Sequence, residues 1–178
     1  MLGSARALPL LLALSLLLAP PLWAAEPREL AWSEMLPADA PEAPPPAAVH
    51  DLSKLADVLA SESGPAASQQ SAAAPVVPEL DGQLVKLPGY IVPLNSSEEG
   101  RVTEFLLVPY YGACIHVPPP PPNQIVHVKT ELGVLMDNLY QPFWIEGPLH
   151  VESISSDIAE ASYQMDASKV YPYESPAN

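Results

Sequence analysis

Apolar residues in the second half of this chain fall into short alternating runs, and this pattern predicts β-strands. The runs begin near Leu80 and are separated by turns rich in glycine, proline and serine. Runs of this length, bounded by such turn residues, are typical of strands. We expect strands within the segments 80–94, 102–111, 123–133, 138–154 and 163–173.

The second run has apolar residues on both of its faces, which predicts a central strand. Phe105 and Leu107 lie on one face, and Leu106 and Val108 lie on the other. Gly89 permits a bend or bulge in the first strand. Five short strands, with one or two helical turns in 156–165, suit a small Greek-key barrel of the oligonucleotide/oligosaccharide-binding type. A small β-sandwich would use the same strands.

The first 25 residues have the pattern of a signal peptide. Arg6 precedes an apolar run at 8–22, and Ala24 and Ala25 supply small residues for cleavage. The run is too short and too poorly flanked for a stable membrane span. The absence of cysteine near the cleavage site excludes a bacterial lipid anchor. We therefore expect a periplasmic protein of a Gram-negative bacterium, with no membrane anchor after cleavage.

A proline- and alanine-rich extension, residues 26–79, is expected between the signal peptide and the barrel domain at 80–173; residues 174–178 form a tail. Apolar residues near Trp32 and Met35 predict a short patch that docks on the domain. Residues 38–48 and 64–75 have linker composition. Between them, leucine and valine recur at helical spacing from Leu52 to Leu59, which predicts one short helix.

Charge excludes one class of partner. The 178 residues include 7 Lys and Arg against 21 Asp and Glu, a formal net charge of −14. Nucleic-acid binding requires clustered cations that replace phosphate counterions, so no nucleic-acid partner is expected. An anionic membrane surface is disfavoured for the same reason.

The candidate chemistry lies in one stretch, Val108 to Val128, which contains the single cysteine and two of the four histidines. If residues 113–117 are extended, Cys114 and His116 point to the same face. Thiolate and imidazole are ligands for zinc and copper, and His127 on the next strand is a third candidate. The register of the strands decides whether His127 faces the other two. The alternative is a buried cysteine that acts as a small apolar core residue.

The stretch also contains five consecutive prolines, Pro118 to Pro122. They form either a polyproline II ligand for an aromatic groove or a rigid connection between two strands. The chain contains none of the GxSxG, HExxH, Walker, dinucleotide-binding or CxxC motifs. No nucleophile, base and orienting group can be assembled, so we do not predict an enzyme.

Four segments together resemble a family of bacterial exported proteins, domain-of-unknown-function family 3299. They read LPGYIVPL, EFLLVPYYGACIHVPPPPPNQIVHV, PFWIEGPL and ASYQM, and the resemblance covers about Leu84 to Met165. It implies an exported, barrel-like domain. Members are sometimes encoded beside metal-uptake transporters of the ATP-binding-cassette class, so the resemblance also implies metal handling by association.

Two functions follow as hypotheses. The first is a periplasmic accessory protein that binds zinc or copper through Cys114, His116 and His127, with an envelope transporter component as partner. The second is a metal-free envelope adaptor that binds another periplasmic protein through its barrel face or its proline-rich loop.

Overall fold

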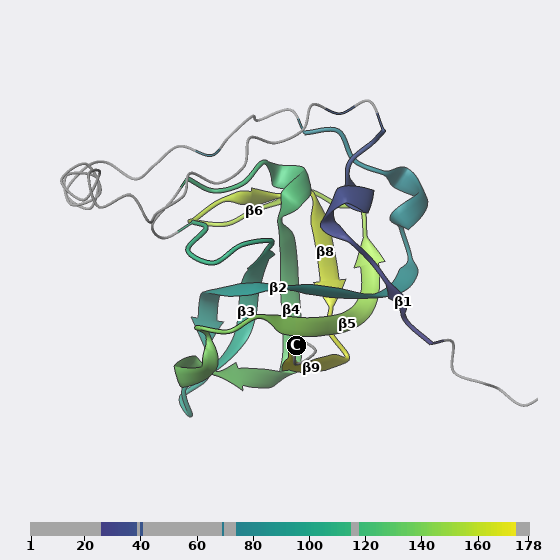
Figure 1. Ribbon diagram of the computed structural model, residues 1–178. Helices are drawn as coiled ribbons and strands as arrows, with labels where there is room; N and C mark the ends of the chain where they lie inside the picture. The colour runs from purple at the N-terminus through teal and green to yellow at the C-terminus, as the bar shows by residue number, and fades with distance from the viewer. Residues whose placement is uncertain (1–25, 39, 41–68, 70–73, 115–117, 174–178) are drawn as a thin grey trace, which may run out of the picture.

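Five strands form a closed barrel in the computed structural model, which describes residues 26–38, 40, 69, 74–114 and 118–173 (Figure 1). The barrel strands are β2 (Gln83–Ser96), β3 (Arg101–Val108), β4 (Val126–Leu135), β5 (Phe143–His150) and β8 (Tyr163–Asp166). They follow the order β2-β3-β4-β8-β5, and β5 pairs back onto β2. Only the β4–β8 pair of this ring is parallel. The predicted mainly β, Greek-key barrel is confirmed, and its closure excludes the alternative of a small β-sandwich.

Strand β2 reaches both of its neighbours because it turns at Gly89. Up to Gly89, which lies opposite Phe143, the strand pairs with β5. From Tyr90, which lies opposite Val108, it pairs with β3. The sequence predicted that Gly89 permits a bend or bulge, and the structure places the change of pairing partner, one corner of the barrel, at this residue.

The N-terminal segment belongs to the same core as the barrel strands. Its elements are β1 (Arg28–Glu29), which runs parallel to β2, and the 3-10 helices η2 (Trp32–Met35) and η4 (Pro78–Leu80). Leu30 and Met35 are fully buried in the main hydrophobic cluster. The indole of Trp32 donates to the carbonyl oxygen of Pro88 at 2.6 Å. The patch predicted to dock on the domain does so, and the core begins before Leu80.

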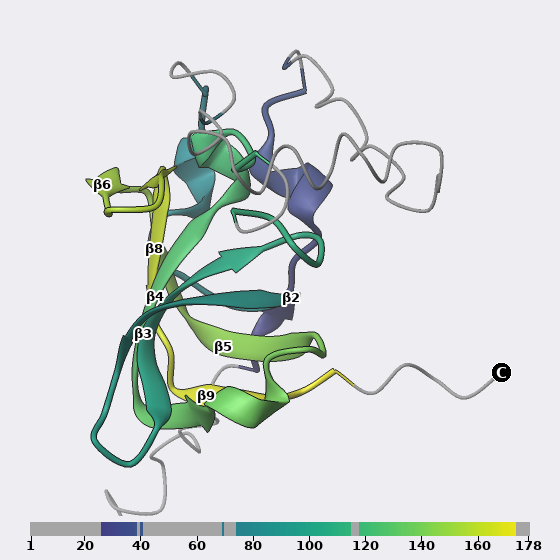
Figure 2. The same ribbon diagram turned by 90° about the vertical axis from the view of Figure 1, so that its left-hand side faces the viewer.

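The two faces of β3 contact two different hydrophobic clusters. Phe105 and Leu107 belong to the main cluster inside the barrel. Leu106 and Val108 belong to a second cluster, which also contains Ala159 and Ala161 from a hairpin at one end of the barrel (Figure 2). The predicted two-faced strand is confirmed, because this hairpin covers its outer face.

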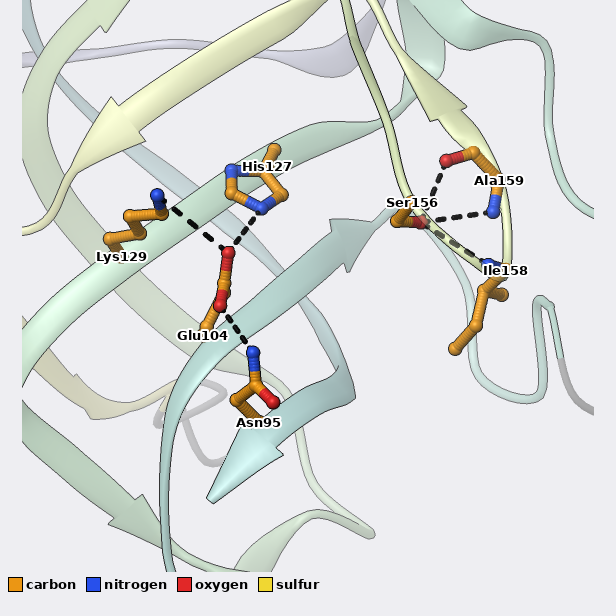
Figure 3. Close-up of polar contacts among 7 residues, drawn as sticks. All are labelled: Asn95, Glu104, His127, Lys129, Ser156, Ile158 and Ala159. Carbon is orange, nitrogen blue, oxygen red and sulfur yellow. Dashed lines mark hydrogen bonds and ion pairs between the residues drawn. The ribbon is translucent and has the colours of Figure 1, made fainter. Parts of the chain in front are cut away.

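The helical turns predicted within 156–165 are wrong. This segment forms the turn of a hairpin between β6 (Ile154–Ser155) and β7 (Glu160–Ala161), followed by β8. The hydroxyl of Ser156 accepts from the backbone N–H groups of Ile158 and Ala159 and donates to the carbonyl of Ala159 (Figure 3). A serine that satisfies backbone groups in this way favours a turn over a helix.

The remaining described elements are short. They are η5 (Pro122–Gln124), η6 (Met136–Asn138) and β9 (Lys169–Pro172), which pairs with β5. All helices in the described ranges are 3-10 helices, and none is long and apolar enough to cross a membrane. The predicted helix from Leu52 to Leu59 and the predicted signal peptide at 1–25 lie outside the described residues.

Candidate functional site

Cys114 lies in a tight turn after β3 and not in an extended strand. Its φ angle is +66°, and Gly112 before it has φ +80°. Side chains alternate only in extended backbone, so the same-face argument for Cys114 and His116 fails at Cys114. The thiol is half-buried against the second hydrophobic cluster, and this burial raises its pKa to about 11. Cys114 is therefore protonated near neutral pH in the metal-free protein.

His127 lies on the outer face of the barrel. Its chain neighbours Val126 and Val128 point into the main core, and His127 pairs across the sheet with Leu106, which is in the second cluster. Cys114 does not lie opposite His127, because the partners of His127 are Leu106 on β3 and Gln164 on β8. The third predicted ligand, His116, lies outside the described residues.

The structure therefore describes two of the three predicted ligands, Cys114 and His127, and not His116. Among the described residues, no group of three His, Cys, Asp or Glu side chains is arranged to hold a metal ion. His116 is not among them, so zinc or copper binding by Cys114, His116 and His127 stays a prediction.

A polar cluster that the sequence did not predict surrounds His127 (Figure 3). Glu104 Oε1 lies 3.0 Å from His127 Nε2 and 3.8 Å from Lys129 Nζ. Glu104 Oε2 accepts from Asn95 Nδ2 at 2.5 Å. The strand registers explain this meeting, because a shift in β2 brings Asn95 opposite Glu104, and Glu104 also pairs with Lys129 on β4.

Electrostatics indicate that this cluster stabilises the sheet. The hydrogen bond from Asn95 is the main cause that lowers the pKa of Glu104, and Lys129 and His127 lower it further against the opposing effect of burial. The carboxylate charge is thereby compensated within the protein. Clefts of about 640 and 280 Å³ adjoin the cluster, and their linings mix acidic, basic and neutral side chains. We interpret the cluster as a structural tie between β2, β3 and β4.

An apolar groove lined by tyrosines lies elsewhere on the barrel. Its volume is about 220 Å³, and it lies between the middle of β2, the turn after β3 and the segment after η6. Its lining consists of Tyr90, Ile91, Val92, Pro93, Val108, Tyr111, Gly112, Ala113, Leu139 and Tyr140. The rings of Tyr90 and Tyr111 pack edge to face with centroids 5.6 Å apart. Tyr111 is 61% exposed and Tyr140 is 69% exposed.

The sequence contains only a weak signal for this groove. Tyr110 and Tyr111 follow a strand, and Tyr140 precedes another, but the residues that meet are up to 50 positions apart. The proline run, by contrast, is largely buried, since Pro119, Pro120 and Pro122 have little exposed surface. That burial favours a rigid connection over an exposed polyproline ligand.

Comparisons with known proteins agree with this fold. The model of a family of unknown function, DUF3299, matches residues 32–172. The chain belongs to the DUF3299 family. A crystal structure of a DUF3299 family protein from Pseudomonas aeruginosa PAO1 is 65% identical to this chain, with a TM-score of 0.75. That match covers 86% of this chain and 100% of the other. A search of curated proteins found no significant match.

The DUF3299 match includes residues that the sequence analysis placed in the N-terminal extension. It begins at residue 32, the tryptophan whose indole bonds to Pro88. The region that the family model matches therefore contains both η2 and the barrel, in agreement with their shared core.

Proposed function

We propose that this protein is an exported, non-catalytic binding protein, an adaptor that holds an extended apolar segment of another envelope protein. The observation that carries the proposal is the tyrosine-lined groove, with Tyr111 and Tyr140 largely exposed at its rim. Tyrosine is enriched at protein interfaces because it offers a large apolar area with few rotatable bonds and a polar tip.

The lining chemistry favours a peptide over an oligosaccharide. Within the described residues, the groove is lined by aliphatic and aromatic side chains and by glycine, and contains no charged or carboxamide side chain. A sugar presents many hydroxyl groups that require partners, whereas an apolar peptide segment requires only burial of its side chains. The volume of about 220 Å³ is also below the range of roughly 300–1,000 Å³ common for small-molecule sites.

The net charge of the chain indicates which residues should flank the apolar core of the bound peptide segment. The net charge of −14 attracts basic groups and repels acidic ones. We therefore expect a partner segment with an apolar core and Lys or Arg on either side. The envelope location rests on Arg6, the apolar run at 8–22 and Ala24–Ala25, which have the order of a cleaved signal peptide.

A peptide-binding experiment tests this function. Fluorescent peptides with one apolar core and either basic or acidic flanks are titrated with the mature protein. We expect binding of the basic-flanked peptides, weakened by salt because exposed charges are screened. Tyr111→Ala and Tyr140→Ala should each weaken binding at least about tenfold, as expected for exposed tyrosines that the bound peptide covers.

Tyr173→Ala is the matched control, because Tyr173 packs on Trp144 and does not line the groove. Its affinity for the same peptides should equal that of the wild type. Absence of peptide binding would contradict the proposal, and so would equal affinities for all three tyrosine variants. Binding of oligosaccharides in place of peptides would contradict the assigned class of partner.

A metal-binding accessory role is the second candidate, and Cys114 is the observation that favours it. A thiol in an oxidising compartment is liable to oxidation unless it is buried or bound. Cys114 is only half-buried at a turn, which leaves one side accessible for a ligand. The resemblance to exported proteins encoded beside metal transporters favours zinc or copper as that ligand.

A further inference from the structure

The side chain of Gln69 makes three hydrogen bonds to backbone groups of the barrel domain. Its Nε2 donates to the carbonyl oxygen of Glu160 at 2.7 Å and to that of Pro120 at 3.0 Å. Its Oε1 accepts from the backbone N–H of Glu160 at 2.9 Å. One carboxamide thus bonds to both backbone groups of one residue in β7 and to the proline run.

The outer edge of β7 explains why Glu160 has these groups available. In the hairpin, Ser156 N–H donates to the carbonyl of Ala159 at 3.0 Å, and Ser155 lies opposite Glu160. Hydrogen-bonded and non-bonded pairs alternate in antiparallel strands, so the N–H and C=O of Glu160 point away from β6. A strand edge with unpaired groups of this kind can accept another strand.

The proline run lies along this edge but cannot satisfy it. The carbonyl of Pro122 accepts from the N–H of Ser162 at 2.9 Å, so the run serves as an acceptor. Proline has no N–H, and Pro118 to Pro122 therefore offer no donor to the carbonyl of Glu160. A partner at this edge needs two hydrogen-bond donors, for the carbonyl oxygens of Glu160 and Pro120, and one acceptor, for the N–H of Glu160. A primary carboxamide carries all of these groups.

We propose that the outer edge of β7 and the proline run form a binding site for a primary carboxamide, and that Gln69 is the ligand that this chain supplies. The site ties Gln69 to β7 and to the proline run, and it closes the β7 edge to strands of other chains. It is separate from the tyrosine-lined groove, because the two sets of lining residues do not overlap.

Two further side-chain carboxamides, directly after the proline run, also donate to backbone carbonyl oxygens. Asn123 Nδ2 donates to the carbonyl of Pro75 at 2.8 Å, and Gln124 Nε2 donates to the carbonyl of Trp32 at 3.1 Å. Trp32, Gln69 and Pro75 are therefore each bonded to the proline run or to η5 through a side-chain amide. Figure 1 shows η5 at the same end of the barrel as the β6–β7 hairpin.

Amide hydrogen exchange in the full mature protein tests the site. The two readouts are the amide of Glu160, which donates to Gln69, and the amide of Ser162, which donates to Pro122. Gln69→Ala should lower the protection factor of the Glu160 amide at least tenfold and leave that of Ser162 unchanged. Gln69→Glu should do the same, because a carboxylate has no donor and would face the carbonyls of Glu160 and Pro120.

The matched controls are Gln83→Ala and Gln83→Glu, which make the same chemical changes at a carboxamide that bonds to Glu79 and Arg28 and not to β7. Both should leave the Glu160 protection factor at the wild-type value. Unchanged protection in Gln69→Ala would overturn the site. Protection retained in Gln69→Glu would overturn its requirement for a carboxamide, and equal loss at Glu160 and Ser162 would show general loosening of the loop in place of a local site.

Discussion

Gly89 of β2 lies directly against Val108 of β3. A Cβ atom at position 89 would lie 2.8 Å from the carbonyl oxygen of Val108 and 2.9 Å from Leu107 Cδ1. The backbones of the two strands approach this closely where β2 leaves β5 and begins to pair with β3. The absence of a side chain at Gly89 thus allows the barrel to close.

We predict that Gly89→Ala lowers the free energy of unfolding by about 1–3 kcal/mol, because the added methyl group overpacks backbone atoms that cannot move freely. Gly100→Ala is the control, since a Cβ there meets nothing within 4 Å and the substitution tests only its φ of +72°. Urea denaturation measures both. A smaller loss for Gly89→Ala than for Gly100→Ala would show that the contact with Val108 is unimportant.

The N-terminal segment should be essential for stability. Met35 is fully buried in the main cluster, and its carbonyl accepts from the hydroxyl of Tyr163 at 2.9 Å. Met35→Ala should lower the free energy of unfolding by about 2–5 kcal/mol, the usual cost of a cavity at a buried methionine. Ser33→Ala, an exposed change in the same 3-10 helix, should have little effect. Thermal and urea denaturation measure the stability of both variants. Equal stability of the two would contradict the contribution of η2 to the core.

The stability of the protein should fall at alkaline pH, because a tyrosine hydroxyl donates a hydrogen bond to a buried carboxylate. Glu146 is 7% exposed and accepts from the hydroxyl of Tyr171 at 2.6 Å and from Lys169 Nζ at 2.8 Å. The hydrogen bond to Glu146 is the main cause that raises the pKa of Tyr171 from 10.0 to about 12. A raised pKa means that the folded state favours the protonated phenol, so its contribution is complete below pH 10 and is lost as the pH rises towards 12.

Tyr171→Phe should therefore destabilise the protein at pH 7 by up to about 1.5–3 kcal/mol, the range for a hydrogen bond to a charged group. The difference from the wild type should narrow between pH 10 and pH 12. Urea denaturation at several pH values measures it, with Tyr173→Phe as a control two residues away. A difference that stays constant up to pH 12 would show that the Tyr171 hydroxyl is not coupled to Glu146.

Metal binding by Cys114, His116 and His127 remains a prediction with a direct test. Zinc and copper(I) are titrated into the reduced wild type while the melting temperature is followed, because a ligand of the folded state raises it. Cys114→Ser should abolish the shift, and His50→Ala, outside the predicted barrel domain, should not. Because burial raises the pKa of Cys114 to about 11, binding must release its proton, and affinity should fall as the pH drops. No shift in the wild type would exclude this site.

Much of the fold could be predicted because strand patterns are local. The alternation of Phe105 and Leu107 with Leu106 and Val108 specifies a strand buried on both faces, and the structure has β3 between two clusters. Gly89 within an apolar run specifies a bend for the same local reason. The barrel class followed from the number and length of such runs, since five short strands suit a closed Greek key.

Backbone detail and strand register could not be predicted from the sequence, and the metal site that depends on them stays a prediction. One positive φ angle at Cys114 removes the alternation that would place it beside His116. A hairpin turn forms after Ser156 in place of the expected helix, because the Ser156 hydroxyl accepts from the backbone N–H groups of Ile158 and Ala159. Neither feature leaves a periodic signal in the sequence.

What the sequence determined by itself is therefore the local pattern: the positions of the strands, the bend at Gly89 and the donor-free backbone of Pro118 to Pro122. The tertiary structure alone decided which distant residues meet. Asn95 with Glu104, Gln69 with Glu160, and Tyr90 with Tyr111 come together through strand pairing and chain reversal. Contacts of this kind depend on closing the barrel, a global event to which every strand contributes, and no single segment encodes them.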